Sequence, residues 1–142
     1  MRITSKGREL ADLAHLGDHP LVLNLCSRIC AAAVTYERIQ EDRCNGHPIQ
    51  SSPSISLYSN ESIATMQDAW DKRIERQDEQ LSTRITKLAL QLPAVTGVEL
   101  GGDPRGCTVK LLFAGKRYDV TSCTWVPVGP NFPLVEIGVP GG

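Results

Sequence analysis

Residues 60–92 read NESIATMQDAWDKRIERQDEQLSTRITKLALQL, and this stretch decides the fold. Apolar side chains recur in it every three or four residues, which is the spacing of one face of an α-helix. Ser59 or Asn60 can cap the start of this helix, and Pro93 bars its continuation beyond Leu92. At ~1.5 Å per residue the helix is about 48 Å long. Its apolar face consists of Ile63, Met66, Trp70, Ile74, Leu81, Ile85, Leu88 and Leu92.

A helix of this length is too long to hide its apolar face in a compact domain. The chain has 142 residues, for which the radius of gyration should be ~14–15 Å. We therefore expect another copy of the chain to cover the face. The eight residues would then form the seam of a homo-oligomer, either a dimer or a larger assembly.

The charges of the same helix are sorted by sign. Asp68, Asp71, Glu75 and Asp78 share one face, while Lys72, Arg73 and Arg76 form a neighbouring basic row. Like charges at i,i+4 cost roughly 0.2–0.5 kcal/mol per pair in an isolated helix. Separated stripes of opposite sign are what coiled coils use to select a partner. A solvated face is the alternative, and the sequence leaves both open.

A second helix is expected from Pro20 to about Cys44. Proline suits a first helical turn, and CNGHP at 44–48 supplies a stop. A heptad-like stripe runs along this helix through Val22, Cys26, Ile29, Ala33, Tyr36 and Gln40. The Ser-rich segment IQSSPSISLYSN, residues 49–60, then reads as a loop that joins two antiparallel helices.

The pattern changes to period two after Pro93. VTGVEL at 95–100, CTVKLLF at 107–113 and YDVTSCTWVPV at 118–128 predict three short strands. LVEI at 134–137 is a candidate for one further edge strand. The sequence thus predicts an α+β protein: a long antiparallel, coiled-coil-like helical hairpin followed by a small three-stranded antiparallel β-meander. Its parts are a short N-terminal helix in 1–19, the hairpin in 20–92, and the sheet with a Gly/Pro-rich tail in 93–142.

The hexapeptide GGDPRG, residues 101–106, lies between the first two predicted strands. Asp103, Pro104 and Gly106 fit a type I turn. The turn does not account for Arg105. Its side chain is either an exposed part of the turn or binds an anionic ligand or a partner. Arg117 from the next hairpin is a second candidate, although turns at 101–106 and 114–117 lie at opposite ends of a meander. Trp125 either covers the sheet or caps a ligand.

Composition narrows the function classes. Fifteen Lys+Arg against 16 Asp+Glu give a net charge of −1, so a general polyanion binder is not expected and nucleic acid is an unlikely partner. No run reaches the ~20 apolar residues of a membrane span, and the start MRITSKGREL lacks a signal peptide's apolar centre. We therefore expect a soluble, cytoplasmic protein.

Metal, cofactor and enzyme chemistry are not expected either. A zinc site would need Cys26, Cys30, Cys44 and His47, but the ends of that helix would lie about 27 Å apart at ~1.5 Å per residue. The five cysteines are expected to be reduced. All three histidines precede residue 48, away from the predicted sheet, and no catalytic motif appears.

Three pieces of the chain resemble a loosely defined group of small phage and prophage accessory proteins of unassigned function. These pieces are ERIQEDRCNG at 37–46, the helix to Leu92, and GGDPRGCTVKLL at 101–112. The resemblance covers roughly residues 37–128. It implies an accessory protein of the kind that inhibits host defence, such as an anti-CRISPR protein.

We therefore expect a non-enzymatic oligomer that blocks a host protein or complex by contact. Two alternatives stay open. One is an oligomer that sequesters an anionic nucleotide messenger through Arg105, with Arg117 or Lys116 and a contribution from a neighbouring chain. The candidates for binding either a ligand or a partner are Asp103, Arg105, Gly106, Arg117 and Trp125. The other is a structural or assembly protein of a virion.

Overall fold

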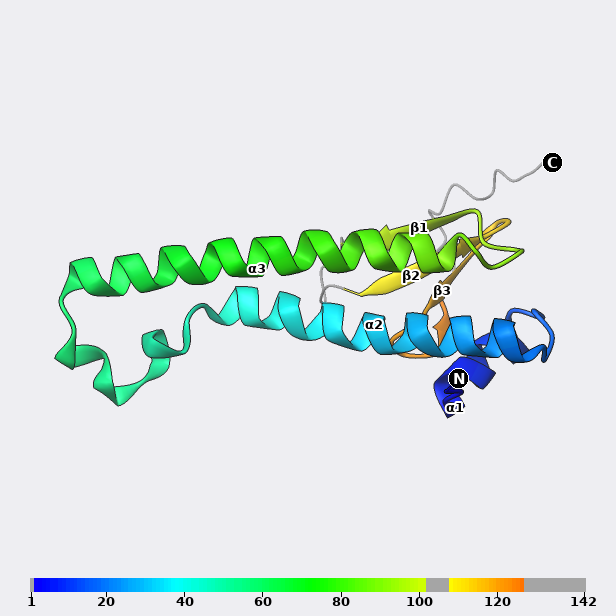
Figure 1. Ribbon diagram of the computed structural model, residues 1–142, viewed down its shortest axis with the longest axis horizontal. Coiled ribbons are helices and arrows are strands. Elements are labelled where there is room, and N and C mark those ends of the chain that lie inside the picture. Colours follow the sequence, from blue (N-terminus) through cyan, green and yellow to red (C-terminus); the bar gives the residue numbers. More distant parts are fainter. Residues whose placement is uncertain (1, 102–107, 127–142) are drawn as a thin grey trace.

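The structure, a computed structural model, describes residues 2–101 and 108–126. Figure 1 shows two long antiparallel helices lying side by side, with a short helix and a small sheet toward one end. The helices are α1 (Ser5–Leu13), α2 (Pro20–Asn45) and α3 (Asn60–Ala89), and two 3-10 helices, η1 (Pro48–Ser51) and η2 (Pro53–Leu57), join α2 to α3. The strands are β1 (Gly97–Leu100), β2 (Val109–Phe113), β3 (Lys116–Asp119) and β4 (Thr124–Trp125). The α+β class is as predicted.

The predicted apolar stripes become the facing sides of the two long helices. On α2, Cys26, Ile29, Ala33, Tyr36 and Gln40 are buried, as the heptad-like spacing indicated. On α3 and just after it, Ile74, Ile85, Leu88 and Leu92 are buried. The structure corrects the expectation at these four α3-stripe positions, because the chain covers them itself and a second copy is not required there. Ile63, Met66, Trp70 and Leu81 are half-buried.

Helix α2 and the 3-10 helix η1 begin in the same way. His19 and His47 each precede a proline, and each histidine Nδ1 accepts a hydrogen bond from a backbone N–H two residues on, at 3.1 Å from Leu21 and 2.9 Å from Ile49. In this way His19 caps α2 and His47 caps η1. Because Pro48 and Pro53 each start a 3-10 turn, the connector predicted as a plain loop is locally helical.

The end of α3 comes earlier than predicted. The helix stops at Ala89, not Leu92, because the backbone tightens there. The N–H of Leu92 donates to the carbonyl of Ala89, only three residues back, at 3.0 Å. This turn still directs Leu92 into the core.

The sheet is a four-stranded antiparallel meander in the order β1-β2-β3-β4, with one strand more than predicted. The run predicted as a single strand from Tyr118 is broken after Asp119. The Asp119 side chain accepts hydrogen bonds from the N–H groups of Thr121 and Ser122, at 2.9 and 3.2 Å, and so forms a turn. Cys123 adopts a left-handed conformation with φ 57° before β4 returns along β3. The candidate strand at 134–137 lies outside the described residues.

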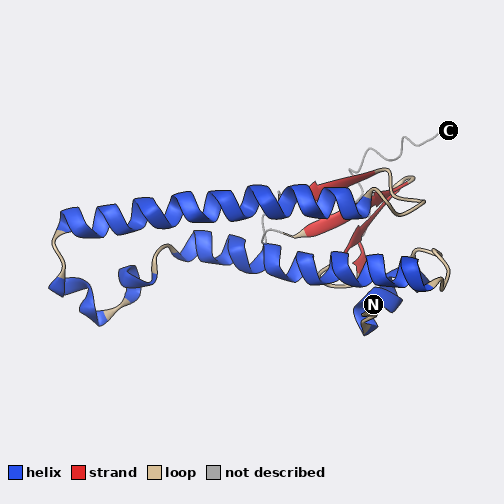
Figure 2. Cartoon of the chain, viewed as in Figure 1, coloured by secondary structure: helices blue, strands red, loops and turns tan. Residues whose placement is uncertain are grey.

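The core sits where α1, α2, α3 and the sheet meet. One cluster of buried apolar side chains draws on all four parts, from Leu10 of α1 to Val120 after β3. Figure 2 shows the strands gathered toward the end of the hairpin where α2 begins and α3 ends. Inward-facing Val109, Leu111 and Phe113 alternate along β2, as predicted from the period-two pattern.

Helix α1 approaches α2 closely at Ser27. The N–H of Thr4 donates to the Ser27 hydroxyl at 2.8 Å, and that hydroxyl donates to the carbonyl of Leu23 at 2.8 Å. Gly7 lies directly against Ser27, where a Cβ would come within 2.7 Å of the backbone nitrogen of Ser27. Only glycine permits this approach without a shift of one helix. In the part of the chain that the structure describes, no helix has the length and apolar content to cross a membrane.

Candidate functional site

The residues predicted to bind a ligand are not brought together among those described. Asp103, Arg105 and Gly106 lie outside the described residues. Arg117 is paired with Leu112 in the sheet and forms an ion pair with Glu99, at 3.5 Å between Nε and Oε2. Its neighbour Tyr118 is the core-facing residue of that strand, so Arg117 points to the opposite face of the sheet.

Trp125 lies on the core-facing side, opposite Tyr118 in the register. Its ring meets those of Phe113 and Tyr118 edge to face, with centroids 5.6 and 5.3 Å apart. Lys116 Nζ lies 5.5 Å from the centroid of the Trp125 ring. Trp125 thus covers the sheet and does not face Arg117, so the described residues do not form the nucleotide site that the sequence suggested.

A polar cluster fastens α2 to α3 beyond the apolar core. The Asp78 carboxylate accepts hydrogen bonds from Gln40 Nε2 at 3.0 Å, Arg43 Nη2 at 2.8 Å and Ser82 Oγ at 2.8 Å. Arg43 also donates to Gln40 Oε1 at 3.1 Å. Partial burial raises the pKa of Asp78, but the hydrogen bonds from Gln40, Ser82 and Arg43 outweigh it and leave the pKa below its ordinary value.

A second polar cluster holds the connector on α3. Gln67 Oε1 accepts hydrogen bonds from the backbone N–H of His47 at 3.0 Å and from Gln50 Nε2 at 3.2 Å. Gln67 Nε2 donates to Asp71 Oδ1 at 2.7 Å. Gly46, with φ 75°, lets the chain turn off α2 directly above this side chain. One glutamine of α3 therefore fixes where the connector begins.

Trp70 stands next to this cluster. The His47 ring meets its ring edge to face at 5.3 Å, and the Arg73 guanidinium carbon lies 5.5 Å from its centroid. The indole N–H is buried and has no hydrogen-bond partner among the described residues. Trp70 therefore contacts the start of the connector through its aromatic ring and not through a hydrogen bond of its indole N–H.

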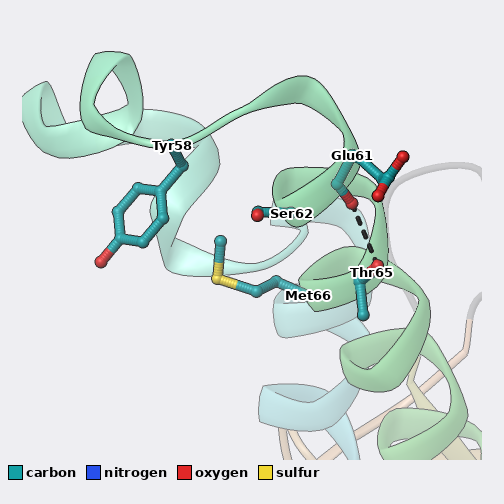
Figure 3. A pocket seen from close by; sticks show the side chains of 5 residues that line it. All are labelled: Tyr58, Glu61, Ser62, Thr65 and Met66. Carbon is teal, nitrogen blue, oxygen red and sulfur yellow. Dashed lines mark hydrogen bonds between the residues drawn. The ribbon is translucent and has the colours of Figure 1, made fainter.

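The end of the hairpin, which we call the tip and define as residues 46–66, exposes apolar side chains. Leu57 is 81% exposed and Tyr58 is 47% exposed. Tyr58, Glu61, Ser62, Thr65 and Met66 line an open hollow of about 350 Å³ beside them. Figure 3 shows Tyr58 and Met66 on one side of Ser62, with Glu61 and Thr65 on the other. The tip thus offers two projecting apolar side chains and a shallow recess.

The tip is also almost free of charge. Glu61 is its only charged residue among 21, whereas the following 21 residues, 67–87, carry ten charges. Protein–protein interfaces are depleted of charge at their centres and enriched in Tyr and Met. This gap in charge is the signal by which the sequence could have marked the tip. Apolar spacing does not indicate the tip, because its two 3-10 helices have only four and five residues.

The described cysteines show no sign of reactivity or metal binding at the core. Burial raises the pKa of Cys26 to about 11. Burial, followed by the neighbouring thiols of Cys123 and Cys26, raises the pKa of Cys30 to about 12. Among residues 2–101 and 108–126, no group of His, Cys, Asp or Glu is arranged to hold a metal ion. Both buried thiols therefore act as small apolar side chains.

No protein-family model, curated protein or solved structure matches the chain. The resemblance to small phage accessory proteins stays an expectation, based on the sequence pieces quoted above.

Proposed function

We propose that this chain is a non-enzymatic binding protein that contacts a partner protein through the tip of its helical hairpin. The observation that carries the proposal is the exposure of Leu57 and Tyr58 within a segment that has one charge in 21 residues. Exposed apolar side chains in an uncharged surround are typical of the centre of an interface.

The support of the tip favours binding with little loss of conformational freedom. Gln67 holds the start of the connector, and His47, Ser52 and Ser59 cap η1, η2 and α3 in turn. A surface that is ordered before it binds loses less entropy on association. Leu57 and Tyr58 are therefore held in place as anchors that a pocket of the partner can receive.

The resemblance to phage accessory proteins directs the search for that partner to a bacterial host protein. Inhibition of a host defence system is the role we expect on that ground. The nucleotide-sequestering alternative receives no support from Arg117 or Trp125, which lie on opposite faces of the sheet.

Photo-crosslinking in bacterial cells tests the proposal. A photo-reactive residue in place of Leu57 should give one discrete adduct with another protein, whereas the same residue in place of Ala31, exposed on α2, should not. The double variant Leu57→Ser/Tyr58→Ser should fail to capture that protein in a pull-down. Leu21→Ser/Leu90→Ser is the matched control, because these leucines are 60% and 52% exposed outside the tip. Equal loss of capture in both variants, or no adduct from position 57, would exclude the tip as the binding surface.

A further inference from the structure

A row of exposed basic side chains runs along α3, separate from the tip. Arg73, Arg76, Arg84 and Lys87 follow one another at spacings of three, eight and three, so they share one side of the helix. All four are exposed. At ~1.5 Å per residue the row is about 21 Å long. We call it the basic row.

The row has no acidic partners within the described chain. The ion pairs there join Arg43 to Asp78, Lys72 to Asp68 and Arg117 to Glu99, and none includes a member of the row. No residue of the row has an acidic residue four positions away on either side; these positions hold Ala69, Gln77, Lys72, Gln80, Leu88, Thr83 and Gln91. Glu79 follows Arg76 by three positions, but the two are not among the ion pairs of the described residues. Arg73 instead rests on the Trp70 ring.

The acidic residues of α3 lie on the other flank. Asp71, Glu75 and Glu79 succeed one another at i,i+4, a spacing at which like charges destabilise a helix. A helix that only needs solvation gains stability from mixed signs at this spacing, as in Asp68–Lys72. The sorting of charges on α3 therefore costs helix stability, and a partner of opposite charge offsets that cost.

From this arrangement we propose that the basic row binds an acidic α-helix of a partner protein. Carboxylates at three- and four-residue spacing on one straight helix match cations at the same spacing on another. The acidic flank of α3 lies on the far side of the helix from the row, so it does not repel the carboxylates of a helix bound there. This surface is separate from the tip, so substitutions in the basic row should not remove binding through the tip.

Two other occupants fit less well. A second copy of the chain has complementary rows, but no large apolar side chain of α3 itself is fully exposed to form the centre of a dimer interface. A nucleic-acid duplex fits less well because the net charge of the chain is −1 and the row supplies only four cations.

The test uses the full chain and a synthetic alanine-based helical peptide with glutamates along one face, followed by fluorescence anisotropy. The triple variant Arg76→Gln/Arg84→Gln/Lys87→Gln keeps Arg73 on Trp70 and should bind about tenfold more weakly than the wild type. The control Arg8→Gln/Arg28→Gln/Arg38→Gln removes three exposed cations on α1 and α2 and has the same net charge. This control should bind the peptide with an affinity within about twofold of that of the wild type.

The salt dependence of peptide binding and the affinity for a DNA duplex complete the test. Binding should vanish near 1 M salt, where the Debye length falls to about 3 Å. The proposal is overturned if the wild type does not bind the peptide, or if both triple variants lose affinity equally. It is also overturned if a DNA duplex binds more tightly than the peptide, or if light scattering shows that the row variant alone no longer self-associates.

Discussion

The two halves of the hairpin are held together by different forces. The proximal half, residues 20–36 and 81–89, packs with α1 and the sheet around one apolar cluster. The distal half, residues 37–80, contributes no side chain to that cluster, and its buried apolar residues are Ile39 and Ile74. Hydrogen bonds centred on Asp78 and Gln67 hold the distal half instead.

The two halves therefore contribute differently to the fold. Apolar burial scales with area and has no direction, so it stabilises the proximal half. Hydrogen bonds contribute less to stability but fix geometry, so they set the register of the helices and the position of the tip. The distal half should therefore open locally at a lower free energy than the proximal half.

The largest expected effect compares the same substitution in both halves. Ile85→Ala should lower the free energy of unfolding by about 4 kcal/mol, because Ile85 is fully buried in the cluster. Ile74→Ala should cost about 2 kcal/mol, because Ile74, although buried, lies outside the apolar cluster. Urea denaturation measures both values. Similar losses would mean that the two halves do not differ in the way proposed.

A smaller effect should follow from removing the charge at the centre of the distal half. Asp78→Asn should lower the free energy of unfolding by about 1 kcal/mol at pH 7, because the carboxylate and its partner Arg43 are partly exposed. Despite partial burial, the hydrogen bonds from Gln40, Ser82 and Arg43 hold the pKa of Asp78 below its ordinary value. The carboxylate therefore stabilises the fold above the pKa of an aspartate in the unfolded chain, and its contribution disappears as the pH falls through the lowered pKa of the folded protein.

Urea midpoints at pH 7 and at about pH 3 measure this dependence. The difference between wild type and Asp78→Asn should be smaller at the lower pH. Asp68→Asn is the control, because the exposed Asp68–Lys72 pair should contribute less than about 0.5 kcal/mol. A pH-independent difference at Asp78 would show that its charge does not contribute.

The smallest effect concerns reactivity and leaves stability unchanged. Cys44, at the exposed end of α2 in the distal half, should react with iodoacetamide in the native protein. Cys26 and Cys30 should react only after unfolding, because burial raises the pKa of each thiol and blocks access. Mass spectrometry of timed samples distinguishes the sites. Native labelling of Cys30 at the rate of Cys44 would show that the proximal half opens readily.

The same contrast explains what could be predicted from the sequence. Apolar spacing identified both long helices and their buried faces, because side chains such as Ile29 and Ile85 repeat with the helical period. The length argument for a second copy was incomplete, because each stripe supplies the cover for the other. Predictions were weaker wherever single polar contacts decide the structure, as at Asp119, which breaks a predicted strand, and at Gln67, which orders a predicted loop.

The candidate site was missed for a related reason. Arg117 and Trp125 were grouped by chemical type, but strand alternation places them on opposite faces of the sheet. The tip has neither a motif nor a period, and only its lack of charge distinguishes it. Such a signal becomes visible when a segment is compared with its neighbours along the chain.

One consequence of the unbroken helix α3 is mechanical. From Asn60 to Ala89 it forms a single rod of about 45 Å at ~1.5 Å per residue. Its far end leads toward β1, which among residues 2–101 and 108–126 pairs with β2. A sideways pull on Leu57 or Tyr58 therefore acts first on the hydrogen bonds of Gln67 and Asp78, so the rod works as a lever whose fixed end is the part of α3 buried in the apolar cluster.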